Sequence, residues 1–135
     1  MLCLGIESTA HTFGCGIVDS KGKIYANVTA AYKTEKGGIQ PSEAKLHHEK
    51  AKDKVVEDAL KVANLNFEKI DLISFSQGPG LAPCLLVGFK KSRELANKLN
   101  IPLIGVNHCI AHLEIGKLMT KAKDPVLLYA SGANT

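Results

Sequence analysis

The chain has 135 residues, of which 45% are hydrophobic and 22% charged, and its formal net charge is +4. This composition is typical of a globular domain with its own core, and the mild charge permits a polyanionic partner without requiring one. No run of about 18 apolar residues is present, so the sequence predicts no membrane-spanning helix.

The first part of the chain predicts an antiparallel meander of three strands. Residues 2–7 and 13–19 are short apolar runs, and residues 24–32 alternate well enough for a third strand. Ser20-Lys21-Gly22-Lys23 is a turn between the last two. Strands joined by such short connections pair with their sequence neighbours.

A long helix is predicted to begin at Pro41, because proline is tolerated in the first helical turn, and to end within residues 64–68. Its inward face is marked by residues spaced three or four apart, which are Ala44, His48, Ala51, Val55, Ala59 and Val62. His48 lies on this stripe and is interpreted as a packed histidine.

The rest of the chain alternates strands and helices. Residues 70–76 and 101–106 predict strands, residues 81–99 the helix between them, and a further helix begins at His108. This order is that of an α/β layer of the ribonuclease H-like type, which actin-like ATPases (the ASKHA fold) duplicate. A last strand over residues 126–130 leads into a polar turn without a partner strand. We therefore expect the chain to be the first part of a longer or split protein.

Two histidines follow the strand over residues 101–106. His108 and His112 are four residues apart, so on a helix they share one face, with Cβ atoms about 6 Å apart, and two imidazoles there can bind one metal ion. Cys109 stands where a His-Glu-x-x-His peptidase has its general-base Glu. The spacing alone leaves open a pair with one buried and one exposed ring, and a metal site needs three or four ligands.

Three polar corners at strand ends are further candidates. The turn over residues 129–135 offers backbone N–H groups to a phosphate or carboxylate, or is a plain hairpin turn. Glu7-Ser8-Thr9 lies where actin-like ATPases have their first phosphate loop, or is a simple turn. Gln77-Gly78-Pro79-Gly80 allows close approach of a ligand or a neighbouring loop, or is a tight strand-to-helix turn, and it lacks the Gly-Lys-Ser/Thr of a Walker A loop.

Several motifs appear together and in order, namely Gly5-Ile6-Glu7-Ser8-Thr9, Gly37-Gly38-Ile39 with Pro41 and His48, Ser76-Gln77-Gly78-Pro79-Gly80-Leu81, the stretch from Val106 to His112, and the stretch from Leu128 to Thr135. With these motifs the chain resembles the N-terminal half of the TsaD-type tRNA threonylcarbamoyladenosine biosynthesis family, formerly named O-sialoglycoprotein endopeptidase. The residues around the histidines are most similar to the archaeal and eukaryotic branch, the catalytic subunit of the KEOPS complex.

The resemblance implies a fold, an activity and a set of site residues. Residues 1–135 are then the N-terminal lobe of an actin-like fold, truncated at its C-terminal end. The family transfers a threonylcarbamoyl group from threonylcarbamoyl-AMP to N6 of the adenosine next to the anticodon, in tRNAs that read codons starting with A. His108, His112 and Tyr129 match its ligands for an iron or zinc ion. Tyr129, Ala130, Ser131, Gly132 and Ala133 match the loop that binds the nucleotide, threonylcarbamoyl-AMP or ATP.

The resemblance also implies partners and a location. The partners are the tRNA substrate, KEOPS-type subunits including a small kinase-like subunit, and a separately encoded C-terminal half where the protein is split. No membrane is involved, and the location is the cytoplasm. The four cysteines, Cys3, Cys15, Cys84 and Cys109, are scattered along the chain and agree with reduced thiols in that compartment.

The sequence departs from the family pattern in two places, and the family's remaining metal ligand, an Asp, belongs to a second half outside these 135 residues. Ala133 replaces the second glycine of the nucleotide loop, and Phe89-Lys90-Lys91 follows Gly88 where the family has small residues. We expect the chain alone to be inactive. The alternatives are a non-catalytic split or degenerate paralogue that serves as a scaffold and, less favoured, a metallopeptidase.

Overall fold

The strands of the chain form one five-stranded sheet in the computed structural model, which describes residues 1–34 and 37–128. Its order is β3-β2-β1-β4-β5. The first three strands pair antiparallel as predicted, and β1 pairs parallel with β4 and β4 with β5. The strands are β1 (Leu2–Glu7), β2 (Thr12–Asp19), β3 (Ile24–Ala31), β4 (Leu72–Gly78) and β5 (Leu103–Asn107).

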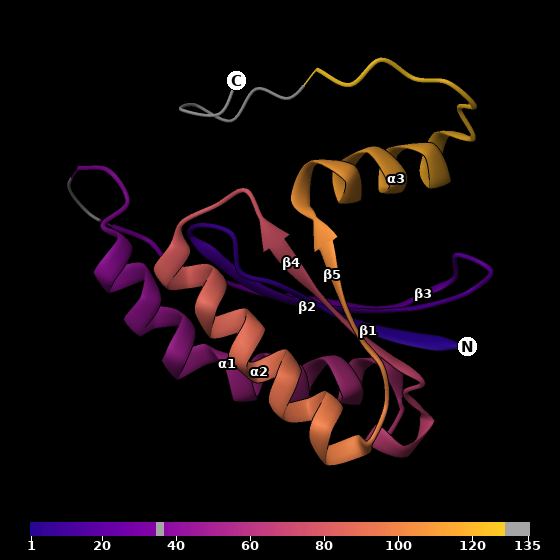
Figure 1. The fold of residues 1–135 in the computed structure, drawn as a ribbon, viewed down its shortest axis with the longest axis horizontal. Helices are drawn as coiled ribbons and strands as arrows, with labels where there is room; N and C mark the ends of the chain where they lie inside the picture. Colours follow the sequence, from indigo (N-terminus) through magenta and orange to yellow (C-terminus); the bar gives the residue numbers. More distant parts are fainter. Residues whose placement is uncertain (35–36, 129–135) are drawn as a thin grey trace.

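Helices lie on both faces of this sheet (Figure 1). Helices α1 (Pro41–Ala63) and α2 (Ala82–Leu99) cover one face, and α3 (His108–Thr120) lies over the other. A short 3₁₀ turn, η1 (Phe67–Lys69), precedes β4. Both α1 and α2 end at an asparagine with a left-handed backbone, at φ 54° for Asn64 and 55° for Asn100, whose N–H groups bond the last helical carbonyls. Asparagine tolerates this backbone region better than other non-glycine residues, which explains why both helices stop there.

The hydrophobic core lies between the sheet and the pair α1 and α2. Four of the six positions predicted to face inward on α1 are buried, and Ala51 is partly buried, whereas Val62 is 64% exposed. Val56 and Leu60 are buried instead, because α1 packs on α2 as well as on β2 and β3, which widens its inward face. The largest fully buried apolar side chains of the core are Leu4, Phe13, Cys15, Ile17, Val56, Ile73, Cys84 and Val87.

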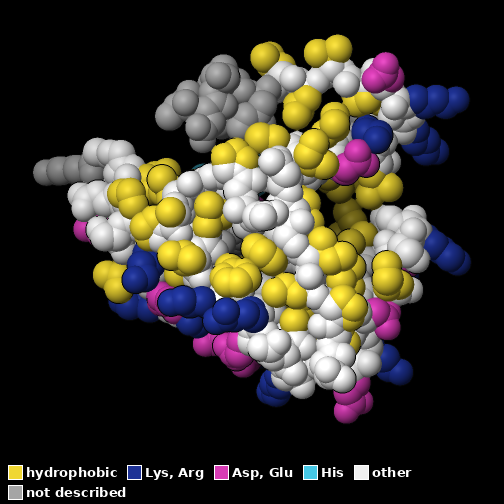
Figure 2. Space-filling model, in the orientation of Figure 1, with side chains coloured by type: hydrophobic (Ala, Val, Ile, Leu, Met, Phe, Trp, Pro, Cys, Tyr) yellow, Lys and Arg dark blue, Asp and Glu magenta, His cyan; other side chains and the backbone are white. Residues whose placement is uncertain are grey.

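Among the described residues, α3 alone covers the opposite face of the sheet, and it does so loosely. A hollow of about 880 Å³ separates Ala111, Ile115 and Leu118 from strand residues such as Gly5 and Gly16. No residue of α3 is buried. Hydrophobic side chains consequently stay exposed over α3 and the segment after it, as Figure 2 shows.

The predicted strand over residues 126–130 is wrong for the part that the structure describes. Residues 126–128 form no strand, and Val126 is 99% exposed. An apolar run becomes a strand only where it finds an edge to pair with, and this segment runs clear of the sheet (Figure 1). Residues 129 and 130 lie outside the described residues. A helix long and apolar enough to cross a bilayer is absent from the described residues.

His48 is packed inside the protein, as predicted. Its ring, 0% exposed, lies edge-on to Phe13 with centroids 5.6 Å apart. Burial, together with the neighbouring His47, lowers the pKa of His48 below its ordinary value, while a hydrogen bond with the Ala10 backbone opposes the shift.

We therefore expect acid to destabilise the fold through His48. Because its pKa is lower when folded, the unfolded chain binds more protons between the folded pKa and about 6.5, so stability is full above that pH and falls as pH falls. Urea unfolding at pH 7.5 and pH 5.5 measures the difference, which should shrink in His48→Gln and persist in the control His112→Gln, because His112 is exposed and is not among the groups that shift the pKa of His48. An equal pH difference in wild type and His48→Gln would refute this assignment.

Candidate metal centre

Three strands bring their carboxyl ends to one edge of the sheet. The parallel pairing places Ile6 beside Phe75 and Ser76 beside Val106, so Glu7, Ser76 and the start of α3 meet there. In open α/β sheets this is the edge at which ligands bind. The candidate site residues are therefore gathered by topology from the beginning, middle and end of the chain.

Asn107 determines where α3 begins. Its side-chain Oδ1 accepts hydrogen bonds from the backbone N–H groups of Cys109 at 2.9 Å and Ile110 at 3.2 Å, which caps the helix. The helix therefore starts at His108, directly after β5. His108 and His112 then lie one turn apart on the same face, as predicted.

The two histidine rings converge. The Nε2 atoms of His108 and His112 are 3.2 Å apart, and the ring centroids are 4.5 Å apart at 83°. Two nitrogen ligands bonded to one zinc ion at about 2.0–2.1 Å lie about 2.9–3.4 Å apart, so this pair fits a shared ion. The described residues contain no group of three or more His, Cys, Asp or Glu side chains that would complete the site.

Glu7 contacts the opposite nitrogen of His108. Its Oε2 atom lies 3.3 Å from His108 Nδ1 and also accepts a hydrogen bond from Ser76 Oγ. Its Oε1 atom accepts from the Thr9 backbone N–H at 2.7 Å and from Thr9 Oγ1. The carboxylate is thereby held by donors from β4 and from the β1–β2 loop. It contacts His108 at Nδ1, the ring nitrogen that does not face His112. This contact was not predicted from the sequence. The expected fold could have indicated it, because parallel pairing of β1, β4 and β5 brings the ends of these strands together.

Glycines allow the loops beneath the site to close on one another. A Cβ atom on Gly80 would lie 2.5 Å from the Thr9 carbonyl oxygen, and the Leu81 N–H donates to that oxygen at 2.7 Å. A Cβ atom on Gly88 would lie 2.1 Å from Ser8 Oγ. Close approach of a neighbouring loop is therefore confirmed for Gly78-Pro79-Gly80, and so is the tight turn from β4 into α2.

The first phosphate-loop position is occupied by packed side chains. Ser8 and Thr9 are both buried, Ser8 against α2 and Thr9 against the β4–α2 loop. Their side chains therefore support Glu7 and the loop rather than face an open anion site. For Ser8 and Thr9 the structure therefore favours the simple turn over the phosphate loop.

Phe89 and Lys91, two of the three residues that depart from the family pattern, are accommodated by packing. The Phe89 ring lies 5.2 Å from that of Phe75. Lys91 is buried between α1 and α2 and pairs with Asp53 at 2.7 Å and Glu94 at 3.1 Å. Burial alone would lower the pKa of Lys91, but these two carboxylates outweigh it and raise the pKa.

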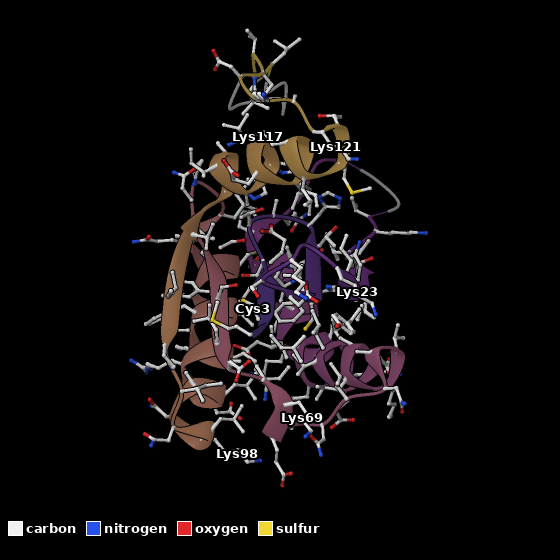
Figure 3. The ribbon with its side chains drawn as sticks, turned by 90° about the vertical axis from the view of Figure 1, so that its right-hand side faces the viewer. Cys3, Lys23, Lys69, Lys98, Lys117 and Lys121 are labelled. Carbon is white, nitrogen blue, oxygen red and sulfur yellow. The ribbon has the colours of Figure 1, made fainter. Side chains whose placement is uncertain are left out.

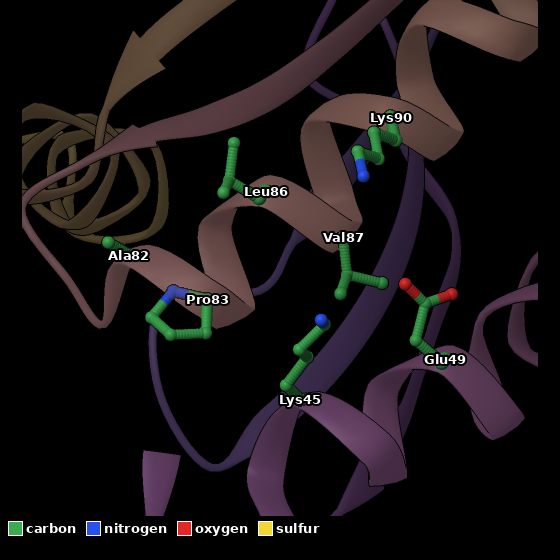
Figure 4. Close-up of a pocket in the computed structure, with 7 residues that line it drawn as sticks. All are labelled: Lys45, Glu49, Ala82, Pro83, Leu86, Val87 and Lys90. Carbon is green, nitrogen blue, oxygen red and sulfur yellow. The ribbon is translucent and has the colours of Figure 1, made fainter. Parts of the chain in front are cut away.

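Lys90 is exposed and lines a small pocket between the two helices. The pocket, of about 290 Å³, is bounded by Lys45 and Glu49 of α1 and by residues of α2, with Val87 at its base (Figure 4). Other lysines are spread over the molecule, with Lys69 and Lys98 at the end opposite Lys117 and Lys121 (Figure 3). The pair Lys69 and Lys98 therefore lies far from the pair Lys117 and Lys121.

The predicted nucleotide loop cannot be placed. Tyr129, Ala130, Ser131, Gly132 and Ala133 lie outside the described residues. Of the predicted metal ligands, the structure brings together His108 and His112, and Tyr129 stays a prediction.

Comparison with known proteins identifies the family. The family model "TsaD: tRNA N6-adenosine threonylcarbamoyltransferase" matches residues 23–135. A "tRNA N6-adenosine threonylcarbamoyltransferase" of Thermococcus gammatolerans is 54% identical over 135 residues, which are 100% of this chain and 41% of that protein. A "Probable bifunctional tRNA threonylcarbamoyladenosine biosynthesis protein" of Methanocaldococcus jannaschii is 53% identical and is covered over 25% of its length. The chain thus spans less than half the length of these relatives.

Solved structures support the predicted fold. YeaZ from Pseudomonas aeruginosa superposes with a TM-score of 0.69 at 16% identity, over 90% of this chain and 50% of that one. A ROK hexokinase from Thermus thermophilus gives a TM-score of 0.52 at 15% identity, over 90% of this chain and 38% of that one. The expected ribonuclease H-like or actin-like α/β fold is therefore confirmed. Together with the match of the family model, these findings show that the chain belongs to the TsaD family of tRNA N6-adenosine threonylcarbamoyltransferases.

Proposed function

We propose that the chain supplies the metal-binding part of a tRNA N6-adenosine threonylcarbamoyltransferase. The observation that carries this proposal is the convergence of two imidazoles, with Nε2 atoms 3.2 Å apart, at the carboxyl edge of the sheet. The proposal is supported by the activity named for relatives that share 50% and 54% sequence identity with this chain. The ion would be iron or zinc, as the resemblance to the family implies, and imidazole nitrogen suits both.

Each residue has a defined part in this proposal. His108, His112 and Tyr129 hold the ion, and a further ligand comes from polypeptide equivalent to the rest of the relatives. An ion held there would supply Lewis-acid chemistry, which would polarise the threonylcarbamoyl carbonyl for attack by the adenine amine, with AMP as the leaving group. The loop over residues 129–133 binds the nucleotide part of threonylcarbamoyl-AMP, or ATP.

The proposed partners follow from the same family membership. They are the tRNA, KEOPS-type subunits with a small kinase-like member, and a second polypeptide where the C-terminal half is encoded separately. The cytoplasm is the proposed location. A scaffold without catalysis makes the opposite prediction in the experiment below.

The test is a chimeric protein in which these 135 residues replace the matching 41% of the Thermococcus gammatolerans relative. Supplied with iron or zinc, partner subunits, tRNA and threonylcarbamoyl-AMP, it should form N6-threonylcarbamoyladenosine, measured by mass spectrometry of the digested tRNA. A folded, metal-loaded chimera without product would contradict the proposal. Activity that appears only after Ala133→Gly would assign this chain to the scaffold instead.

A further inference from the structure

The contact between Glu7 and His108 has a chemical consequence for the histidine. A neutral imidazole carries one N–H donor and one lone-pair acceptor, and a carboxylate only accepts hydrogen bonds. With Glu7 Oε2 at 3.3 Å from His108 Nδ1, the proton belongs on Nδ1. The lone pair then belongs on Nε2, the atom that faces His112 Nε2 at 3.2 Å.

The carboxylate is anchored well enough to impose this choice. Three donors hold it, namely the Thr9 N–H at 2.7 Å, Thr9 Oγ1 and Ser76 Oγ. Thr9 is buried, and Ser76 lies within β4. The β1–β2 loop and β4 thus fix the position of the Glu7 carboxylate independently of α3. The His108 ring on α3 can then take its orientation from this carboxylate.

We propose that Glu7 is a positioning residue, which fixes the Nδ1–H tautomer of His108 and so aims its Nε2 lone pair at the metal. Carboxylates behind metal-binding histidines serve this purpose in metalloproteins. The benefit of this tautomer for metal binding rests on the proposed function. The tautomer itself is a property of the metal-free chain. It can therefore be tested without any activity.

Long-range imidazole ¹H–¹⁵N correlation spectra of the metal-free chain at pH 8 report the tautomer of each histidine. We expect His108 in the Nδ1–H form in wild type and a shift toward Nε2–H in Glu7→Gln. Zinc affinity, measured by competition with a chromophoric chelator, should fall about 10–100-fold in Glu7→Gln. The matched control is Glu114→Gln, which changes a carboxylate of α3 that pairs with Lys117 and should leave both readouts unchanged.

Two outcomes would overturn the proposal. One is an Nε2–H tautomer of His108 in wild type, a result that needs no variant to fold. The other is weaker zinc binding in Glu7→Gln without a change of tautomer, which would reduce Glu7 to a support for the loop. If the chimera is active but His108 is in the Nε2–H form, only the proposed role of Glu7 is refuted. If the chimera is inactive but His108 is in the Nδ1–H form, only the proposed function is refuted.

Discussion

Replacing His112 with alanine in the chimera should reduce tRNA modification at least about 100-fold, a larger loss than that expected from residues behind the ligands. In the proposed site the described residues would contribute two ligands, and a metal site requires three or four. Without His112 a single described histidine remains. Product formation and bound zinc or iron, quantified on the same samples, should fall together.

The fold should survive this change, which makes the result interpretable. His112 is exposed, so His112→Ala should alter the free energy of unfolding by no more than about 0.5 kcal/mol. His11→Ala is the matched control, because His11 is also exposed but lies on the β1–β2 loop. It should retain full activity and metal content. A His112→Ala chimera with wild-type activity would remove this histidine from the metal centre.

The second large effect is expected at Gly80. In Gly80→Ala the new Cβ atom meets the Thr9 carbonyl oxygen at 2.5 Å, and neither backbone can withdraw without breaking the 2.7 Å hydrogen bond from Leu81. Overpacking of this kind destabilises a fold by about 1–3 kcal/mol. Because Thr9 also holds Glu7, zinc affinity should fall as well. Urea unfolding and chelator competition measure the two effects.

Gly38→Ala is the control for Gly80→Ala. A Cβ atom on Gly38 meets no atom of the described residues within 4 Å, and its backbone needs no positive φ, so the free energy of unfolding should change by no more than about 0.5 kcal/mol. Equal effects of the two substitutions would show that the loop contact at Gly80 is unimportant.

Local patterns predicted the elements well. Short turns between apolar runs predicted the meander, and two histidines four residues apart predicted a helix with both rings on one face. Both features depend on neighbours within a few residues, which hydrophobic periodicity and residue spacing describe. The same holds for His48, whose place on an apolar stripe indicated burial.

Features that depend on distant partners could not be predicted in this way. The contact of Glu7 with His108 joins residues about 100 positions apart through the parallel pairing of β1, β4 and β5. The strand expected over residues 126–130 is absent over residues 126–128, because this apolar run lies beside no sheet edge with which it could pair. Val62 is exposed because the inward face of α1 also follows α2.

X-ray absorption spectroscopy of the zinc complex tests most directly whether one ion joins the two histidines. The spectrum of the wild-type chain should show two imidazole nitrogens at about 2.0–2.1 Å from zinc, and that of His112→Ala should show one. Scattering from one imidazole or none in wild type, or an unchanged spectrum in His112→Ala, would contradict a metal ion shared by His108 and His112.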